Sequence, residues 1–276
     1  MRHPLARTLL PAALVALTLT ACTGQADGDA RPGAGEASEA RGELSGELTV
    51  FAAASLTAAF DELATGFEAR HPSLDVLPIT YDGSSVLVTQ FIEGAPADVF
   101  ASADERNMQK VIEADLAVEP VDFATNLLEI AVAPGDPLGI DGLDDLADGA
   151  TETADGLPIT VVLCAPEVPC GAAAQALIAD AGIIVRPASE EQNVTAVLTK
   201  VKRGEADAGL VYATDVAAAG GEVDGVEIEN ADAATNVYPI TALTGAANPE
   251  AARAFVEFVT SGEGRAVLAS FGFGSP

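Results

Sequence analysis

The chain has 276 residues, with 42 acidic and 13 basic side chains and a formal net charge of −29. This balance excludes the basic face of a nucleic-acid binder and a polybasic patch for a membrane surface. Because His3 and His71 are the only histidines, a histidine-rich zinc site and a two-histidine relay are excluded as well. Hydrophobic residues make up 49% of the chain, which is enough for a packed core.

The first 22 residues have the pattern of an export signal. A basic start is followed by an apolar run from residue 9 to 19 and then by Leu-Thr-Ala-Cys. The run is too short for a permanent membrane span, so we predict a cleaved signal peptide over residues 1–21. The last four residues resemble the bacterial lipobox, which implies lipidation of Cys22 and an anchor on the outer face of the cell membrane. The alternative is an ordinary secretory signal that contains a cysteine.

Residues 22–46 are mostly small, polar or charged, with almost no large apolar side chain. Such a segment buries too little surface to offset its ordering entropy. We therefore predict a flexible tether between the lipidated Cys22 and the folded part of the chain.

From Glu47 onward, strand-like apolar runs alternate with segments of helical periodicity. A short strand over 48–52 precedes a helix whose apolar face recurs from Leu56 to Phe67, with Ser55 as its expected N-cap. The pattern predicts further strands at 75–81, 98–102, 127–133, 159–164, 208–212 and 237–243, and helices near 84, 108–112, 171–180, 215–219, 249 and 263. This alternation predicts an α/β fold with largely parallel sheets in two lobes.

Three predicted strand-to-helix junctions are built from small or hydroxyl-bearing residues, at 52–56, 81–85 and 168–171. The start of a helix leaves backbone N–H groups free and carries partial positive charge, so it binds anions without a basic side chain. In open α/β sheets, ligands bind at such turns. Taken singly, each junction is equally typical of an ordinary helix cap.

Taken together, these segments resemble the periplasmic molybdate-binding proteins of ABC importers. Val-Phe-Ala-Ala-Ala-Ser-Leu-Thr at 50–57, Ser-Ser-Val-Leu-Val-Thr-Gln at 84–90 and Gly-Ala-Pro-Ala-Asp at 94–98 carry the likeness, which continues through 166–171, 193–194, 209–215 and 271–273. The resemblance implies a two-lobe fold of the type II periplasmic-binding-protein kind. Each lobe would be a mainly parallel sheet flanked by helices, with the ligand in the cleft between lobes. Lobe 1 is expected over 47–126 plus 238–276, and lobe 2 over 127–237.

The same resemblance implies a set of hydrogen-bond donors to an oxyanion. Two serines would donate hydroxyl and backbone N–H bonds, two residues only backbone N–H bonds, and a tyrosine its phenolic O–H. The family commonly has Ala where this chain has a cysteine, and a cysteine keeps the backbone donor. Ser85 is an alternative to its neighbour. The five expected ligand residues are Ser55, Ser84, Cys170, Val194 and Tyr212.

The implied function is binding of molybdate or tungstate outside the cytoplasmic membrane and delivery to an ABC permease by closure of the lobes. No catalytic residue, no cofactor, no nucleic acid and no side chain bonded to molybdenum are expected, and the protein is expected to be a monomer. Because molybdate is a dianion, its contacts should all be donors, so we expect Asp82 to point away. A sulfate or other oxyanion binder is the alternative. A secreted serine hydrolase using Ser55 or Ser84 is disfavoured by the lack of a G-x-S-x-G or S-x-x-K motif.

Besides Cys22, the chain has Cys164 and Cys170. A pair of cysteines in an exported protein favours a disulfide, which here would stiffen the loop that offers the Cys170 N–H. The alternative is two buried free thiols.

Overall fold

The computed structural model describes residues 43–117 and 119–276, and this part of the chain forms one compact unit. The predicted signal peptide, Cys22 and the tether up to residue 42 lie outside the described residues. The first strand, β1 (Ser45–Leu48), begins within the last residues assigned to the tether. It pairs in parallel with β3 (Ser73–Val76) in a separate two-stranded sheet.

The first five-stranded sheet has the order β4-β2-β5-β12-β6. Strand β2 runs parallel to β4 and β5, whereas β12 runs antiparallel to β5 and β6. Its strands are β2 (Val50–Ala53), β4 (Thr80–Asp82), β5 (Val99–Ala101), β6 (Val121–Asn126) and β12 (Asn236–Ala242).

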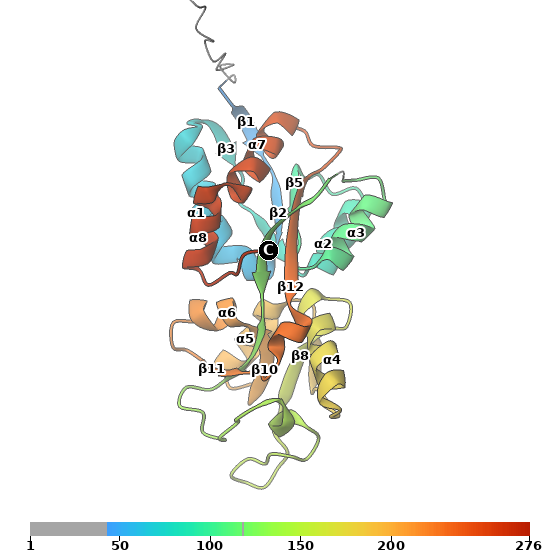
Figure 1. Cartoon of the computed structure of the whole chain (residues 1–276), viewed down its shortest axis with the longest axis vertical. Coiled ribbons are helices and arrows are strands. Elements are labelled where there is room, and N and C mark those ends of the chain that lie inside the picture. The colour runs from blue at the N-terminus through green and yellow to red at the C-terminus, as the bar shows by residue number, and fades with distance from the viewer. Residues whose placement is uncertain (1–42, 118) are drawn as a thin grey trace, which may run out of the picture. The chain divides into compact units, whose positions relative to one another are not determined.

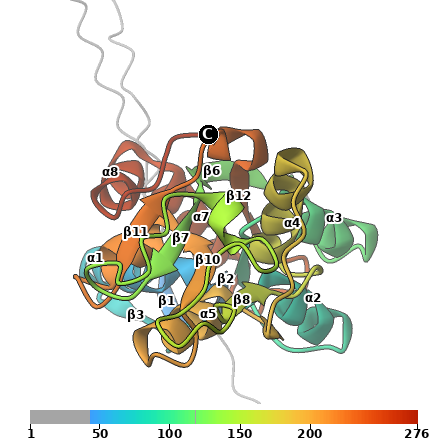
Figure 2. The same cartoon turned by 90° about the horizontal axis from the view of Figure 1, so that it is seen from below.

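Helices cover both faces of this sheet. Helices α1 and α8 lie on one side and α2 and α3 on the other, as the two views show (Figures 1 and 2). Phenylalanines fill the core between α1 and α7, with ring centroids of Phe67 and Phe255 5.2 Å apart. These helices are α1 (Thr57–Arg70), α2 (Ser84–Ile92), α3 (Glu105–Glu113), α7 (Pro249–Thr260) and α8 (Gly262–Ser270).

The second five-stranded sheet has the order β11-β7-β10-β8-β9. Strand β8 is parallel to β9 and β10, and β7 is antiparallel to β10 and β11. Its core is built from aliphatic side chains such as Ile130, Val197 and Leu210. The elements are β7 (Leu128–Val132), β8 (Val161–Cys164), β9 (Ser189–Glu191), β10 (Ala208–Tyr212), β11 (Asp224–Glu227), α4 (Pro169–Ala181), α5 (Val194–Lys202) and α6 (Ala213–Ala218).

Short 3₁₀ turns complete the structure: η1 (Ala54–Leu56), η2 (Leu143–Leu146) and η3 (Ala231–Ala234). None of the helices among residues 43–276 is long and apolar enough to cross a membrane.

The chain passes between the two sheets at two places. Strand β6 ends at Asn126 in the first sheet and β7 begins at Leu128 in the second, and the chain returns to the first sheet where β12 begins at Asn236. Asn126 and Asn236 are themselves paired in register, and Figure 1 shows β6 and β12 side by side. The lobe boundaries predicted from the sequence stay a prediction. The strands of the two sheets divide between 126 and 128, as those bounds have it, but return to the first sheet at Asn236 rather than at residue 238.

Two details differ from the sequence analysis. Each sheet is mixed rather than mainly parallel, because the segments that connect the sheets, β6, β7 and β12, run against their neighbours. Ser55 is not the N-cap of α1: it lies inside η1, and α1 begins only at Thr57. The hydroxyl of Ser55 is therefore not used to cap a helix.

Candidate functional site

A small cavity of about 10 Å³ lies where helices that follow strands of both sheets begin. A space of this volume holds about one water molecule. All five residues that the sequence analysis named as oxyanion ligands line it, although they come from both sheets and are up to 157 residues apart in the chain. The walls are Ala53, Ala54, Ser55, Asp82, Gly83, Ser84, Ala103, Val168, Pro169, Cys170, Asn193, Val194 and Tyr212.

Three helices of nine or more residues start at this cavity. The N-cap residues of α2, α4 and α5 are Gly83, Val168 and Asn193, and all three line the walls. At α2 and α4 no side chain caps the first turn, so the first backbone N–H groups remain free for a ligand. Converging helix starts give the cavity a positive potential without a basic side chain.

Ser55 presents its hydroxyl from the first sheet's side. Its Oγ lies 3.0 Å from the hydroxyl of Tyr238, which is fully buried. Thr57 makes the hydrogen bond that closes η1, with its Oγ1 donating to the Ala54 carbonyl oxygen. The turn is closed by Thr57, and in the contact between Ser55 and Tyr238 either hydroxyl can be the donor.

Ser84 is the first residue of α2 and is completely buried. Its Oγ accepts a hydrogen bond of 3.0 Å from the Ala103 N–H, so its own proton is available. The neighbouring Ser85 does not line the cavity, although its buried Oγ lacks a partner among the described residues. Of the two neighbouring serines, Ser84 is therefore the one at the cavity.

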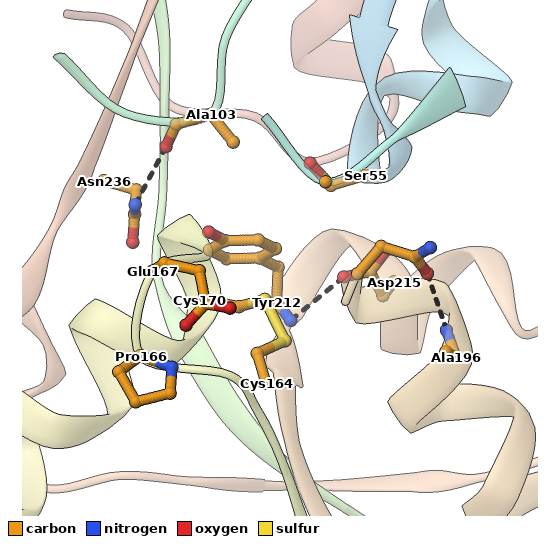
Figure 3. The surroundings of a disulfide bond; sticks show 12 residues. Ser55, Ala103, Cys164, Pro166, Glu167, Cys170, Ala196, Tyr212, Asp215 and Asn236 are labelled. Carbon is orange, nitrogen blue, oxygen red and sulfur yellow. Dashed lines mark hydrogen bonds between the residues drawn. A yellow bond between two sulfur atoms is a disulfide. The ribbon is translucent and has the colours of Figure 1, made fainter. Parts of the chain in front are cut away.

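The predicted disulfide between Cys164 and Cys170 is present, with Cα atoms 5.7 Å apart. It joins the end of β8 to the second residue of α4 and lies beside the ring of Tyr212 (Figure 3). Gly171 follows, and a side chain there would collide with the carbonyl oxygens of Cys164 and Ala165. Disulfide and glycine together hold the start of α4 against the end of β8.

Val194 is the first residue of α5, and its own side chain packs in the second core. The preceding Asn193 accepts the Ala196 N–H with its Oδ1 at 2.9 Å. The Asn193 side chain thus caps the N–H of Ala196 and not that of Val194. The backbone N–H of Val194 remains available at the cavity wall.

Tyr212 ends β10, and its side chain is 1% exposed. Its hydroxyl is buried and makes no hydrogen bond of normal geometry within the described residues. Burial raises the pKa of this phenol well above its usual value, and the nearby Tyr238 hydroxyl adds to the rise. The hydroxyl is therefore a permanent O–H donor at the cavity wall.

Asp215 holds the backbone of Tyr212. It is 8% exposed and accepts the Tyr212 N–H with its Oδ2 at 3.0 Å. Burial raises the pKa of this carboxyl to about 7, and the hydrogen bond from Tyr212 opposes the rise.

Asp82 is the one charged residue among the cavity walls, and the expectation that its side chain points away stays a prediction. Its Oδ1 accepts the Gly83 N–H at 2.8 Å and the Asn193 side-chain amide at 2.9 Å. Both bonds go to the same oxygen, and they join the end of β4 in the first sheet to the N-cap residue of α5 beside the second sheet. Gly83 fits closely at the same place, because a Cβ there would collide with the Gln192 carbonyl oxygen.

The structure offers no support for hydrolase chemistry at these serines. His71, the only histidine among the described residues, follows α1 and packs its ring on Phe67 at 4.7 Å. In the described ranges there is also no cluster of His, Cys, Asp and Glu able to hold a metal ion. The arrangement suits binding of a small anion by neutral donors.

Sequence reasoning missed three groups around the cavity. Tyr238 and Ala103 hold the two serine hydroxyls from behind, and Asn193 joins the two sides through Asp82. No local sequence pattern distinguishes Tyr238 from a core residue of β12. The strand–Asn–Val–helix sequence before α5 does have the form of an N-cap.

Comparisons with known proteins agree with this geometry. A family model for bacterial extracellular solute-binding proteins matches residues 48–274. The molybdate-binding protein ModA of Mycobacterium tuberculosis (strain ATCC 25618 / H37Rv) is 41% identical over 270 residues, which cover 98% of this chain and 97% of that protein.

Two solved structures share the fold. The periplasmic molybdate-binding protein of Azotobacter vinelandii has a TM-score of 0.68 at 20% identity, over 83% of this chain and 99% of that chain. The sulfate-binding protein SubI of Mycobacterium tuberculosis H37Rv has a TM-score of 0.69 at 18% identity, over 82% of this chain and 86% of that chain. The expected two-lobe α/β fold is therefore confirmed.

Proposed function

The chain belongs to the bacterial extracellular solute-binding protein family, and we propose that it binds molybdate outside the cytoplasmic membrane and delivers it to an ABC permease. The 41% identity to a molybdate-binding protein, over nearly the whole of both chains, supports this cargo. The relatives are binding proteins and not enzymes, so molybdate is a transported ligand rather than a cofactor.

The buried hydroxyl of Tyr212, which makes no hydrogen bond of normal geometry within the described residues, is the observation that carries the proposal. A buried donor without a partner is costly, by about 1–3 kcal/mol, and such a group is retained where a ligand completes its hydrogen bonding. In our proposal Ser55, Ser84 and Tyr212 donate hydroxyl protons to the anion. Cys170 and Val194 donate backbone N–H groups.

Neutral donors are sufficient for tight binding of a dianion. A hydrogen bond to a charged group contributes roughly 1.5–3 kcal/mol. Some seven such bonds offset the desolvation of the anion and leave an affinity between about micromolar and nanomolar. No proton acceptor is needed, because molybdate is fully deprotonated at neutral pH.

The cavity of about 10 Å³ is smaller than a tetrahedral anion, so we propose that the lobes separate to admit it and close on it. The two chain passages, near 125–128 and 236–239, act as the hinge. Bonds between the two sides belong to the closed state. Arg106 on α3, for example, donates to the carbonyl oxygens of Pro166 and Glu167 at 3.3 and 3.4 Å.

Calorimetry of the mature protein with molybdate, tungstate, sulfate and phosphate tests the cargo. We expect molybdate and tungstate to bind with micromolar to nanomolar affinity, and Ser55→Ala to weaken binding. Ser270→Ala serves as the control, because the Ser270 hydroxyl bonds the Val267 carbonyl oxygen at an exposed position. No heat and no thermal stabilisation with molybdate and tungstate would refute the proposal. Tighter binding of sulfate would reassign the cargo to that smaller dianion.

We further propose that the protein is a monomeric lipoprotein, exported by the signal over 1–21 and held by lipid on Cys22. The basic, apolar and small-residue parts of the signal, in that order, support this. Metabolic labelling with radioactive palmitate should mark the wild-type protein and leave Cys22→Ser unlabelled. Label on the Cys22→Ser variant, or none on the wild type, would contradict the anchor.

A further inference from the structure

Tyr238 lies directly behind the cavity without lining it. Its side chain is completely buried, and its hydroxyl lies 3.0 Å from the Oγ of Ser55. Its ring contacts the ring of Tyr212, with centroids 6.0 Å apart. It therefore touches two of the proposed ligands from the side away from the anion.

Two polar side chains, those of Asn126 and Ser55, lie within hydrogen-bond distance of the Tyr238 hydroxyl. Asn126 accepts the Leu127 N–H with its Oδ1 at 3.0 Å, so its amide nitrogen faces the other way. That nitrogen donates to Thr214 Oγ1 at 2.7 Å and to the Tyr238 hydroxyl oxygen at 3.4 Å. The 3.0 Å contact between the Tyr238 hydroxyl and Ser55 Oγ allows either oxygen to donate. Because the Asn126 nitrogen can only donate, Ser55 Oγ is an acceptor open to the Tyr238 proton.

The second serine ligand has an equivalent support. The Ala103 N–H donates to Ser84 Oγ, and the carbonyl oxygen of Ala103 accepts from the Asn236 side-chain amide at 2.8 Å. Asn236 and Tyr238 are two residues apart on β12 and so face the same side of the strand. Figure 3 shows Asn236 reaching Ala103. One face of β12 thus reaches the surroundings of both serines.

We propose that Tyr238 is a positioning residue for anion binding. By donating to Ser55 Oγ, its hydroxyl occupies the acceptor side of that oxygen and leaves the Ser55 proton directed at the bound anion. The chain of donors runs from Asn126 through Tyr238 and Ser55 to the ligand, so each hydroxyl accepts from behind and donates forward. This inference rests on the proposed function of the cavity.

The test is a double-mutant cycle on molybdate affinity, measured by calorimetry on the mature protein. Tyr238→Phe removes the hydroxyl and keeps the ring, and we expect binding to weaken roughly 3- to 10-fold. In a Ser55→Ala background the same change should weaken binding less than twofold, because the group that Tyr238 positions is gone. In a Tyr212→Phe background, Tyr238→Phe should weaken molybdate binding by the same factor as in the wild type.

The matched control is Tyr81→Phe. The Tyr81 hydroxyl donates to Asp61 Oδ1 at 2.8 Å, on the outer side of α1, so its removal should leave affinity unchanged. If wild-type protein fails to bind molybdate, the proposed function fails. If the wild type binds and Tyr238→Phe binds equally well, or if Tyr238→Phe has the same effect with and without Ser55, the positioning role is overturned.

If Tyr238→Phe does not fold, the proposal can be tested on protein that keeps Tyr238, by observing the tyrosine side chain itself. The chain has three tyrosines, so protein labelled with 3-fluorotyrosine gives three ¹⁹F signals, which Tyr81→Phe and Tyr212→Phe assign. Saturating molybdate should shift the Tyr238 signal, and Ser55→Ala should abolish the shift. The inference would be overturned if molybdate did not shift the Tyr238 signal, or if the shift were equally large in Ser55→Ala.

Discussion

Replacing Tyr212 by Phe should change stability and binding in opposite directions. The Tyr212 hydroxyl is buried and makes no hydrogen bond of normal geometry within the described residues. Phe has the same ring and only lacks this group. In the protein without ligand, the substitution removes an unsatisfied polar atom, so the free energy of unfolding should stay the same or rise by up to about 1–3 kcal/mol.

In our proposal, the same hydroxyl donates to the anion when molybdate is bound. A hydrogen bond of this kind contributes roughly 1.5–3 kcal/mol, so the dissociation constant should rise about 10- to 150-fold. The disulfide beside the ring and the ring contact with Tyr238 are unaffected, which confines the change to the donor. An ordinary core tyrosine would behave differently, because losing its hydrogen bond lowers stability.

The assay combines thermal denaturation without ligand and calorimetric titration with molybdate, for the wild type, Tyr212→Phe and the control Tyr81→Phe. Tyr212→Phe should melt at or above the wild-type temperature and gain much less from added molybdate. A lower melting temperature together with unchanged affinity would refute the reasoning, since it would mean that the hydroxyl serves the fold and not the ligand.

Three further predictions concern closure, the disulfide and pH. Gly83→Ala should weaken molybdate binding without unfolding the protein, since the new Cβ would collide with the Gln192 carbonyl oxygen just before α5. Gly245→Ala is the control, because a Cβ there meets nothing within 4 Å. Scattering with and without molybdate will show whether closure is lost. Reducing the Cys164–Cys170 disulfide should lower the free energy of unfolding by about 2 kcal/mol and weaken binding through the start of α4, and equal melting curves and affinities with and without reductant would contradict this. Because burial raises the pKa of Asp215 to about 7 from the ordinary value of 3.8, the native state holds this proton more tightly than the unfolded state. Stability should therefore fall as the pH rises from about 4 to 7, and chemical denaturation should show a shallower fall in Asp215→Asn.

Much of the fold was predictable from periodicity. Strand β10 was predicted at its observed bounds, and α1 follows the predicted apolar face from Leu56 to Phe67. The mixed direction of the strands was not predictable. Periodicity reports which side chains are buried, but the direction of a strand depends on where the chain crosses between sheets.

The parts of the site that are built from strand-to-helix junctions could be predicted, because such junctions have a recognisable local sequence of small residues. The three junctions of small residues contain Ser55, Ser84 and Cys170. The resemblance to a known family assigned these three as ligands and added Val194 and Tyr212. All five line the same cavity; their roles as ligands stay a prediction. The separate prediction that Ser55 caps α1 was wrong, since it lies inside η1 and caps no helix.

Tyr238 was beyond the reach of sequence reasoning. It is separated from Ser55 by 183 residues, and its contact depends on how β12 packs behind η1. Asp82 shows the same limit. Its carboxylate is tolerable at the cavity because Asn193, 111 residues away, donates to it, and no local pattern records such a partner.

A neutral cavity in an acidic protein has a consequence for the rate of capture. The full sequence carries a formal net charge of −29, and no basic side chain lies in the cavity walls to draw a dianion inward. Long-range repulsion therefore slows the approach of the anion, while short-range hydrogen bonds set how long it stays. Added salt screens the repulsion, so association should become faster as ionic strength rises, the reverse of what electrostatically steered partners show.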